Sequence, residues 1–259
     1  METITSRKNP LCVHLRRLAA DGKYRRQEGA FLCDGPKLLE EALKWAPERL
    51  RSVVCTDPAS LPPLPEWVRL VQAPGDVLAS LSPSQTPQGV VAECAVWQPE
   101  LPETLPGRRY VVLDGVQDPG NVGTILRTAD AFWADGLFLL EGCADLYHPR
   151  TVRASMGAVL RCPVWRCGTE ELAALLRRSG IPLYGAALAR STLDPRKLTD
   201  SRLALAIGSE GRGLSPEILA LCAGAVRLPM NSRCESLNAA AASAALLWEL
   251  ARRDDRAEQ

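Results

Sequence analysis

The chain has 259 residues, of which 46% are hydrophobic and 24% charged, values typical of a globular protein. This composition excludes a disordered chain and a collagen-like repeat, and the length allows one large domain or two smaller ones. Lys and Arg number 31 against 30 Asp and Glu, so the net charge of +1 neither requires nor excludes a polyanionic partner.

Cysteine spacing and the lack of long apolar segments favour a cytoplasmic protein. The nine cysteines include no Cys-x-x-Cys pair, which argues against a zinc site or a disulfide framework. Residues 1–10 lack the apolar stretch of a signal peptide, and no segment approaches the roughly 20 apolar residues that span a bilayer. We therefore expect cytoplasmic localisation, with no metal and no membrane contact.

The first part of the chain, residues 1–54, is basic, with eleven Lys and Arg against seven acids. Three leucines recur there at helical spacing and predict a helix with one buried stripe: Leu11, Leu15 and Leu18. Several basic side chains lie off that stripe, namely Arg16, Arg17, Arg25 and Arg26. Taken alone, they are most simply interpreted as a solvated helix face.

The composition changes sharply over residues 55–107, which hold half of the twenty prolines, one basic residue and six acids. Repeated proline over residues 98–107 predicts a linker, because proline prevents the continuation of helix or strand. We therefore divide the chain into domains of residues 1–105 and 106–259. The elements expected before the linker are a helix over 36–45 and strands over 50–55, 68–71 and 89–96.

After residue 107, predicted strands alternate with predicted helices. The strands are expected over 110–113, 137–140, 181–188, 203–207 and 225–228, and the helices over 121–133, 169–178, 215–222 and 236–253. Such alternation predicts an α/β domain with a mostly parallel sheet that is covered on both faces. Ligands are then expected beyond the carboxyl ends of the strands.

The first motif, DGVQDPGNVGTILRTA over residues 114–129, joins a strand to a helix through a turn. Turn chemistry alone explains its Gly and Pro residues. Asn121 is equally well interpreted as a helix N-cap or as a functional residue. For Arg127 we favour function, because a charge in a helix of largely apolar composition is expected to need a partner.

The second motif, AIGSEGRGLSP over residues 206–216, is a strand followed by a loop with three glycines in six residues. It matches neither the dinucleotide fingerprint nor the P-loop. Glycines at this density allow either a tight loop or the close approach of backbone to a ligand. Glu210 lies among them with no helix to explain it, which favours a site.

The third motif, RLPMNSRCESLNAAAAS over residues 227–243, leads into the last predicted helix. Ser236 or Asn238 could cap that helix, and capping explains Ser236 well. The helix begins with a run of alanines. Small side chains permit close packing within the fold or across a dimer.

Together the motifs resemble a known family. DGVQDPGNVGTILRTADAF, TVRASMGAV, LAIGSEGRGLS and LPMNSRCESLNAAAA are similar, in order and spacing, to the signatures of the SpoU/TrmH RNA ribose 2′-O-methyltransferases of the SPOUT superfamily. The resemblance covers roughly residues 108–250. ITSRKNPLCVHLRRL and GAFLCDGPKLLEEAL more loosely resemble the N-terminal RNA-binding domain of that family.

The resemblance implies an α/β methyltransferase domain with a C-terminal trefoil knot, acting as a homodimer with S-adenosyl-L-methionine (AdoMet). By motif position it implies that AdoMet binds at Gly208, Leu228 and Leu237 and that the polar active-site residues are Asn121, Arg127, Glu210, Ser236 and Asn238. Two positions depart from the family pattern: Ser232 replaces a usual Gly, and Ala239-Ala240 replaces a common Val-Ser pair.

The implied chemistry agrees with these residue types. A ribose 2′-hydroxyl attacks the methyl group in line, so the enzyme mainly aligns the two groups and handles one proton. Because a guanidinium is a poor base, we expect Arg127 to orient the hydroxyl or a phosphate. The basic run of Arg16, Arg17, Arg25 and Arg26 becomes an expected RNA-docking surface.

We therefore expect methylation of a ribose in structured RNA, with ribosomal RNA favoured over transfer RNA because a separate N-terminal domain is present. A non-catalytic RNA-binding or ribosome-assembly factor of the same fold is one alternative. The joint presence of the polar residues argues against it. A dinucleotide-dependent enzyme is another alternative, and the missing G-x-G-x-x-G motif argues against that.

Overall fold

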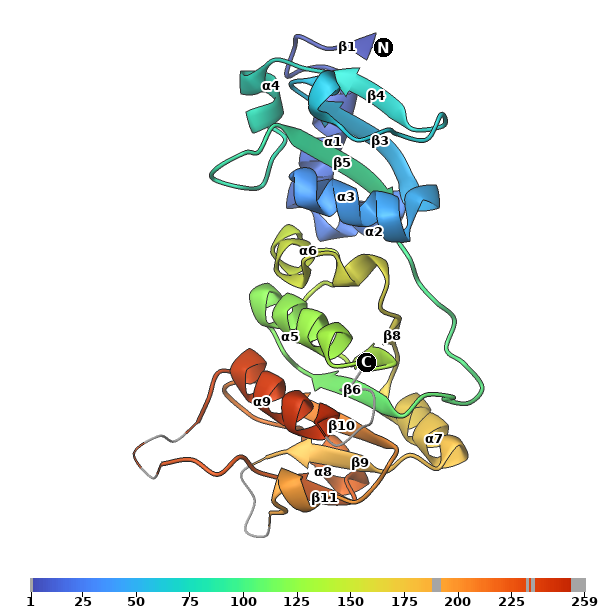
Figure 1. Ribbon diagram of the computed structural model, residues 1–259, viewed down its shortest axis with the longest axis vertical. Coiled ribbons are helices and arrows are strands. Elements are labelled where there is room, and N and C mark those ends of the chain that lie inside the picture. Colours follow the sequence, from blue (N-terminus) through green and yellow to red (C-terminus); the bar gives the residue numbers. More distant parts are fainter. Residues whose placement is uncertain (1, 188–191, 232, 234–235, 253–259) are drawn as a thin grey trace. The chain divides into compact units, whose positions relative to one another are not determined.

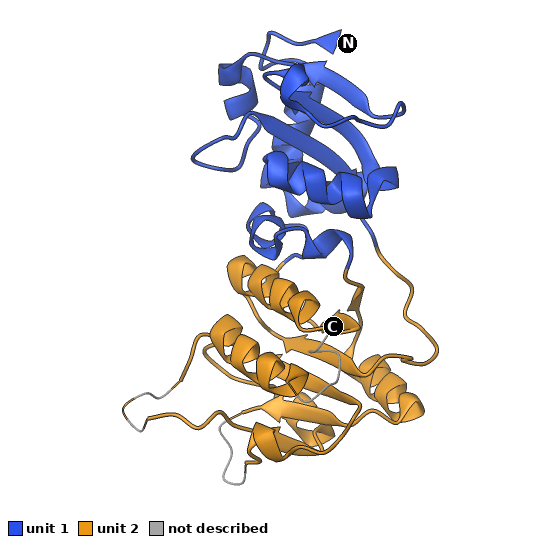
Figure 2. Cartoon of the chain, in the orientation of Figure 1, with its two compact units in different colours: residues 1–97, 145–161 blue, residues 98–144, 162–259 orange. Residues whose placement is uncertain are grey.

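The computed structural model describes residues 2–187, 192–231, 233 and 236–252. The chain forms two compact units (Figure 2): unit 1 comprises residues 1–97 and 145–161, and unit 2 comprises residues 98–144 and 162–259. Unit 1 therefore includes a segment that the sequence-based division assigns to the C-terminal domain. The domain division at residue 105 stays a prediction.

Unit 1 is built on a five-stranded mixed sheet (Figure 1). In spatial order its strands are β1 (Glu2–Thr3), β4 (Arg69–Gln72), β3 (Leu50–Cys55), β5 (Val90–Ala95) and β2 (Ala30–Asp34). β1, β4 and β3 pair in parallel, whereas β5 runs antiparallel to β3 and β2. Asp34 at the end of β2 and Arg69 at the start of β4 therefore lie at opposite ends of the sheet.

The helices of unit 1 are α1 (Pro10–Ala20), α2 (Gly22–Glu28), α3 (Pro36–Trp45), α4 (Gly75–Ala79) and α6 (Pro149–Ser155). The predicted leucine stripe on α1 is confirmed, because Leu11, Leu15 and Leu18 are buried in the core with strand residues such as Leu32 and Val54. Helices α3 and α6 both contact β2. Apolar burial of these helices against the sheet stabilises the unit.

Residues 145–161 join unit 1 through polar contacts as well as through packing. Arg25 donates to Asp145 at 2.8 Å, and Arg161 donates to Glu41 at 2.6 Å. The Tyr147 hydroxyl donates to the Trp97 carbonyl at 2.6 Å. These bonds link residues that are far apart in sequence, so α6, which the sequence pattern did not predict, is fixed by tertiary contacts.

Unit 2 contains a six-stranded sheet in which every strand pair is parallel (Figure 1). In spatial order the strands are β11 (Gly224–Val226), β9 (Leu183–Ala186), β10 (Leu203–Gly208), β6 (Arg109–Asp114), β7 (Gly136–Leu139) and β8 (Val164–Arg166). The predicted α/β class and mostly parallel sheet are confirmed. The central strands are buried, as expected where helices cover both faces.

The helices of unit 2 are α5 (Pro119–Ala131), α7 (Thr169–Ser179), α8 (Pro216–Leu221) and α9 (Ala239–Ala251). On one face of the sheet, α7 and α8 pack onto a core that includes Tyr110, Phe138 and Trp165. On the other face, α5 and α9 lie side by side (Figure 1). Asn238, and not Ser236, is the N-cap of α9, so the last predicted helix begins three residues later than expected.

Candidate active site

The three sequence motifs meet at the carboxyl end of the parallel sheet in unit 2. β6 and β10 are neighbours in parallel register, so their last residues, Asp114 and Gly208, pair with each other. Asp114 also accepts a hydrogen bond from the Ser215 amide at 2.6 Å, which joins the end of β6 to the start of α8. The site therefore lies where open parallel sheets bind ligands.

The glycine-rich loop after β10 is a tight backbone turn. Ser209 and Gly213 exchange both backbone hydrogen bonds, at 2.9 and 3.0 Å, and Gly213 has a φ of +69°. A Cβ atom on Gly208 would lie 2.2 Å from the Gly213 carbonyl carbon, a distance that no side chain tolerates. Gly208 is therefore required by the closure of the loop itself.

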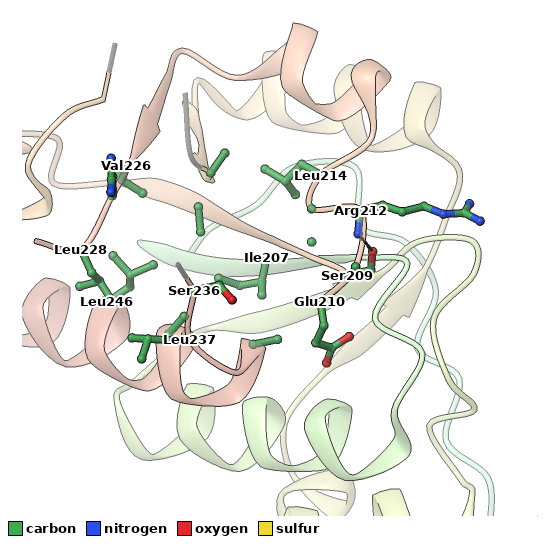
Figure 3. A pocket seen from close by; sticks show the side chains of 18 of the residues that line it. Ile207, Ser209, Glu210, Arg212, Leu214, Val226, Leu228, Ser236, Leu237 and Leu246 are labelled. Carbon is green, nitrogen blue, oxygen red and sulfur yellow. Dashed lines mark hydrogen bonds between the residues drawn. The ribbon is translucent and has the colours of Figure 1, made fainter. Parts of the chain in front are cut away.

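A pocket of about 400 Å³ opens beside this loop. Its walls come from the ends of β9, β10 and β11, from the segment before α9 and from α9 itself. Leu228, Leu237 and Leu246 gather at one end, and Glu210 lies at the other (Figure 3). The three residues predicted to bind AdoMet, Gly208, Leu228 and Leu237, all line this pocket.

Three of the predicted polar residues form a chain of hydrogen bonds at the glycine loop. The side-chain Nδ2 of Asn238 donates to Asn121 Oδ1 at 3.1 Å, and Asn121 Nδ2 donates to Glu210 Oε1. Asn238 Oδ1 meanwhile caps α9 by accepting from the Ala240 and Ala241 amides. The first turns of α5 and α9 thus fix the position of one Glu210 carboxylate oxygen.

Ser236 and Arg127 occupy different surroundings from this chain. Ser236 lines the pocket, and its active-site role stays a prediction. Arg127 is exposed on α5, and within the described residues it has no hydrogen bond or ion pair. The premise that the Arg127 charge needs a partner in the fold does not hold, because the apolar face of α5 contains Val122, Ile125 and Leu126 and leaves Arg127 on the outside. Its functional role stays a prediction.

The sequence analysis missed other residues of the pocket. Ala186 ends β9, Ala187 follows it, and Ala242 belongs to α9. Small side chains carry no chemical signal in a sequence, and only the parallel order of β9 and β10 places the first two beside the glycine loop. Ser232, the departure from the family pattern, lies outside the described residues.

Burial raises the pKa of three cysteine thiols of unit 2. Burial raises the pKa of Cys167 and of Cys222 to about 11. It also raises the pKa of Cys143, whose thiol donates to the Leu113 carbonyl at the end of β6. These thiols therefore stay protonated near neutral pH. No group of three or more His, Cys, Asp or Glu suited to a metal ion occurs among the described residues.

The predicted RNA-binding arginines of unit 1 do not form one uniform surface. Arg26 is exposed, Arg16 donates to the Arg7 carbonyl at 2.8 Å, and the Arg17 guanidinium stacks 3.8 Å from the centre of the Tyr24 ring. Arg25 is only 4% exposed and is bonded to Asp145. A guanidinium buried in this way cannot reach an RNA phosphate, so the prediction for Arg25 is wrong.

Within the described residues, no helix has the length and apolar character needed to cross a membrane.

Each of the two parts of the chain matches a known protein family. Residues 108–248 match the SpoU rRNA Methylase family, and residues 4–92 match the MRM3-like substrate binding domain. The 23S rRNA (guanosine(2553)-2′-O)-methyltransferase RlmP of Bacillus subtilis is 31% identical over 96% of this chain and 99% of its own length.

Solved structures agree with the sequence matches. An AdoMet-bound rRNA methyltransferase from Sinorhizobium meliloti has a TM-score of 0.85 and 29% identity over 97% of each chain. The SpoU methyltransferase AviRb from Streptomyces viridochromogenes, also solved with AdoMet, has a TM-score of 0.79 and 27% identity over 95% of this chain and 98% of its own. The chain therefore belongs to the SpoU rRNA Methylase family and is an RNA methyltransferase that uses AdoMet.

Proposed function

We propose that this chain transfers a methyl group to a ribose 2′-hydroxyl of ribosomal RNA. The observation that carries the proposal is the hydrogen-bonded chain of Asn238, Asn121 and Glu210, whose last member lines the pocket. The B. subtilis relative, which is named for 2′-O-methylation of 23S rRNA, supports ribosomal RNA as the substrate. Transfer RNA is the alternative substrate.

The pocket fits AdoMet in size and in chemistry. Its volume of about 400 Å³ falls in the range of small-molecule sites. Leu228, Leu237 and Leu246 offer apolar contacts for a flat adenine, and the backbone near Gly208 offers polar groups. When bound, AdoMet supplies an activated methyl group. We assign Gly208, Leu228 and Leu237 to its binding.

Each polar residue has a proposed role toward the ribose. Glu210 is exposed, and one of its carboxylate oxygens accepts from Asn121, which leaves the other oxygen for the 2′-hydroxyl and its proton. Asn121 and Asn238 hold that carboxylate in position. Ser236 contributes a hydroxyl from the pocket wall. Arg127 orients the acceptor through its planar guanidinium and binds a neighbouring phosphate.

Homodimer formation through unit 2 is part of the proposal. The exposed residues of α9 follow one stripe, Ala241, Ala245 and Trp248, and the Trp248 side chain is 51% exposed and touches the Phe132 ring at the end of α5. A second copy would cover this apolar stripe, and the alanines would allow its backbone to come close.

A trefoil knot in the C-terminal segment is also proposed. This proposal rests on the similarity of the motifs over residues 206–216 and 227–243 to the family signatures. Cytoplasmic localisation agrees with the free thiols of the eight described cysteines. RNA docking is assigned to Arg16, Arg17 and Arg26 of unit 1.

The purified chain tests the function directly. With tritiated AdoMet, we expect label to enter ribosomal RNA transcripts and to be recovered as a 2′-O-methylated nucleoside. The Glu210→Gln variant should bind AdoMet and transfer little label. Label that enters transfer RNA alone would replace ribosomal RNA as the substrate, and failure to label either RNA would favour a non-catalytic RNA-binding or assembly factor.

A further inference from the structure

Unit 1 contains a pocket of its own, of about 250 Å³, which the methyltransferase chemistry does not use. It is bounded by the end of β2, the start of α3, the loop at residues 83–84 and one side of α6. We propose that this pocket binds a single unpaired RNA nucleotide, whose base carries an exocyclic amino group that faces Asp34 and whose phosphate faces Arg150 and Arg153. The inference rests on the proposed action on RNA and adds a specific contact to it.

The inner wall of the pocket is apolar and suits a flat base. Leu32, Leu38 and Val152 each have less than 5% of their surface exposed, so their pocket-facing atoms lie deep. A volume of about 250 Å³ is below the usual range for drug-sized ligands. The pocket therefore admits one base-sized group and excludes a stacked pair.

Asp34 supplies the polar contact within these walls. Its Oδ2 accepts from the Ser82 hydroxyl at 2.8 Å, whereas its buried Oδ1 has no hydrogen-bond partner in the described structure. Burial raises the pKa of Asp34, because removal from water disfavours the charged carboxylate. A ligand N–H group would reduce the cost of burying this carboxylate once a rotation of the Asp34 side chain turns Oδ1 toward the pocket.

Positive charge lies at the outer side of the same pocket. Arg150 and Arg153 are exposed, one helical turn apart on α6, and His148 lies just before that helix. Arg153 also donates to the Ser84 hydroxyl at 3.0 Å, which directs its guanidinium toward the pocket loop. Guanidinium groups bind phosphate through paired hydrogen bonds, and phosphate is the anionic group of RNA.

A pocket with a carboxylate among apolar walls and with arginines at its outer side discriminates among ligands. A free phosphate would use the arginines and be repelled by Asp34, and an apolar ligand would leave all three charges unused. Adenine, cytosine and guanine present exocyclic N–H donors, whereas uracil presents a carbonyl acceptor in place of the cytosine amine. A nucleotide with an amino-bearing base satisfies both ends of the pocket.

Binding of nucleoside monophosphates to the full-length chain tests the inference. CMP against UMP, and GMP against IMP, are matched pairs that differ by the amino group, and their dissociation constants can be measured by ligand-observed NMR titration. We expect the amino-bearing member to bind about tenfold more tightly, because an unmatched hydrogen bond to a charged group is lost in the other. Equal affinities within both pairs would overturn the assignment of Asp34.

Variants separate the two ends of the pocket. Asp34→Asn should remove the preference for CMP over UMP, and Arg150→Gln, at an exposed site where misfolding is not expected, should weaken all four ligands several-fold. Arg69→Gln is the matched control, since it removes an exposed arginine at the opposite end of the sheet. A loss in Arg69→Gln as large as that in Arg150→Gln would contradict the proposal.

Failure of this inference is distinguishable from failure of the proposed function. AdoMet binding and methyl transfer depend on unit 2 and are measured separately on the same samples. If methyl transfer persists while no nucleotide binds wild-type chain, the pocket proposal is wrong and the methyltransferase proposal stands. If nucleotides bind with the expected preference and no RNA is methylated, the methyltransferase proposal is wrong and the pocket proposal stands.

Discussion

Asn238 performs two tasks that one substitution can separate. Its Oδ1 caps α9, and its Nδ2 donates to Asn121, which in turn holds Glu210. Ser is as good an N-cap as Asn but has no amide donor to reach Asn121. Asn238→Ser should therefore keep the helix start and break the polar chain, whereas Asn238→Ala should lose both.

The expected magnitudes follow from these bonds. Loss of the cap costs about 1 kcal/mol of unfolding free energy, and loss of a neutral hydrogen bond costs between about 0.5 and about 1.5 kcal/mol. For a chain of this size, about 1 kcal/mol corresponds to roughly 2–4 °C in melting temperature. Asn238→Ala should thus melt roughly 2–4 °C below Asn238→Ser. If the hydrogen bond to Asn121 serves transition-state alignment, kcat/KM in Asn238→Ser should fall between about twofold and about tenfold.

Thermal unfolding and initial rates of methyl transfer, normalised to folded protein, check both numbers. Ser215→Ala is the control, because it removes the N-cap of α8 outside the polar chain and should lower stability without lowering the rate. The double variant Asn121→Ala with Asn238→Ser should lose no more activity than Asn121→Ala alone. Wild-type turnover in Asn238→Ser would show that its hydrogen bond to Asn121 does not serve methyl transfer. Rate losses that multiply in the double variant would show that the two residues act independently.

Three further predictions concern the same unit. Ala242 lines the pocket, so Ala242→Leu should fill part of its volume and weaken AdoMet binding at least tenfold by calorimetry; unchanged affinity in a folded variant would place the cofactor elsewhere. Arg127 is exposed and unpaired among the described residues, so Arg127→Lys should leave stability within about 0.5 kcal/mol and slow methyl transfer by orders of magnitude, and full activity would show that charge alone suffices. Trp248→Glu should convert the proposed dimer to a monomer in sedimentation, and a persistent dimer would move the interface off α9.

Local patterns predicted the elements that contain their own start signals. Ser215 and Pro216 marked the beginning of α8, and the leucine spacing of α1 identified its buried stripe. At α9 the same logic favoured Ser236, but Asn238 is the cap, because its side chain reaches the free amides of the first turn. Two capping residues so close together cannot be ranked from sequence alone.

Local sequence patterns could not predict whether an individual charged side chain is buried or exposed. The sequence pattern places Arg25 in a run of exposed basic residues. Its burial depends on Asp145, which lies 120 residues away in sequence. Arg127 reads as a charge near a core, and its exposure depends on which face of α5 meets the sheet. By contrast, Asn121, Glu210 and Asn238 were selected together by motif resemblance, and the parallel pairing of β6 and β10 explains why they meet.

A map of ribose methylation across the total RNA of cells with and without the gene tests whether this chain methylates ribosomal RNA. We predict that one 2′-O-methylated ribosomal nucleotide disappears without the gene, that wild-type chain restores it, and that Glu210→Gln does not. An unchanged methylation map, or restoration by Glu210→Gln to the wild-type level, would contradict the assignment of this chain as a ribosomal RNA 2′-O-methyltransferase that acts through Glu210.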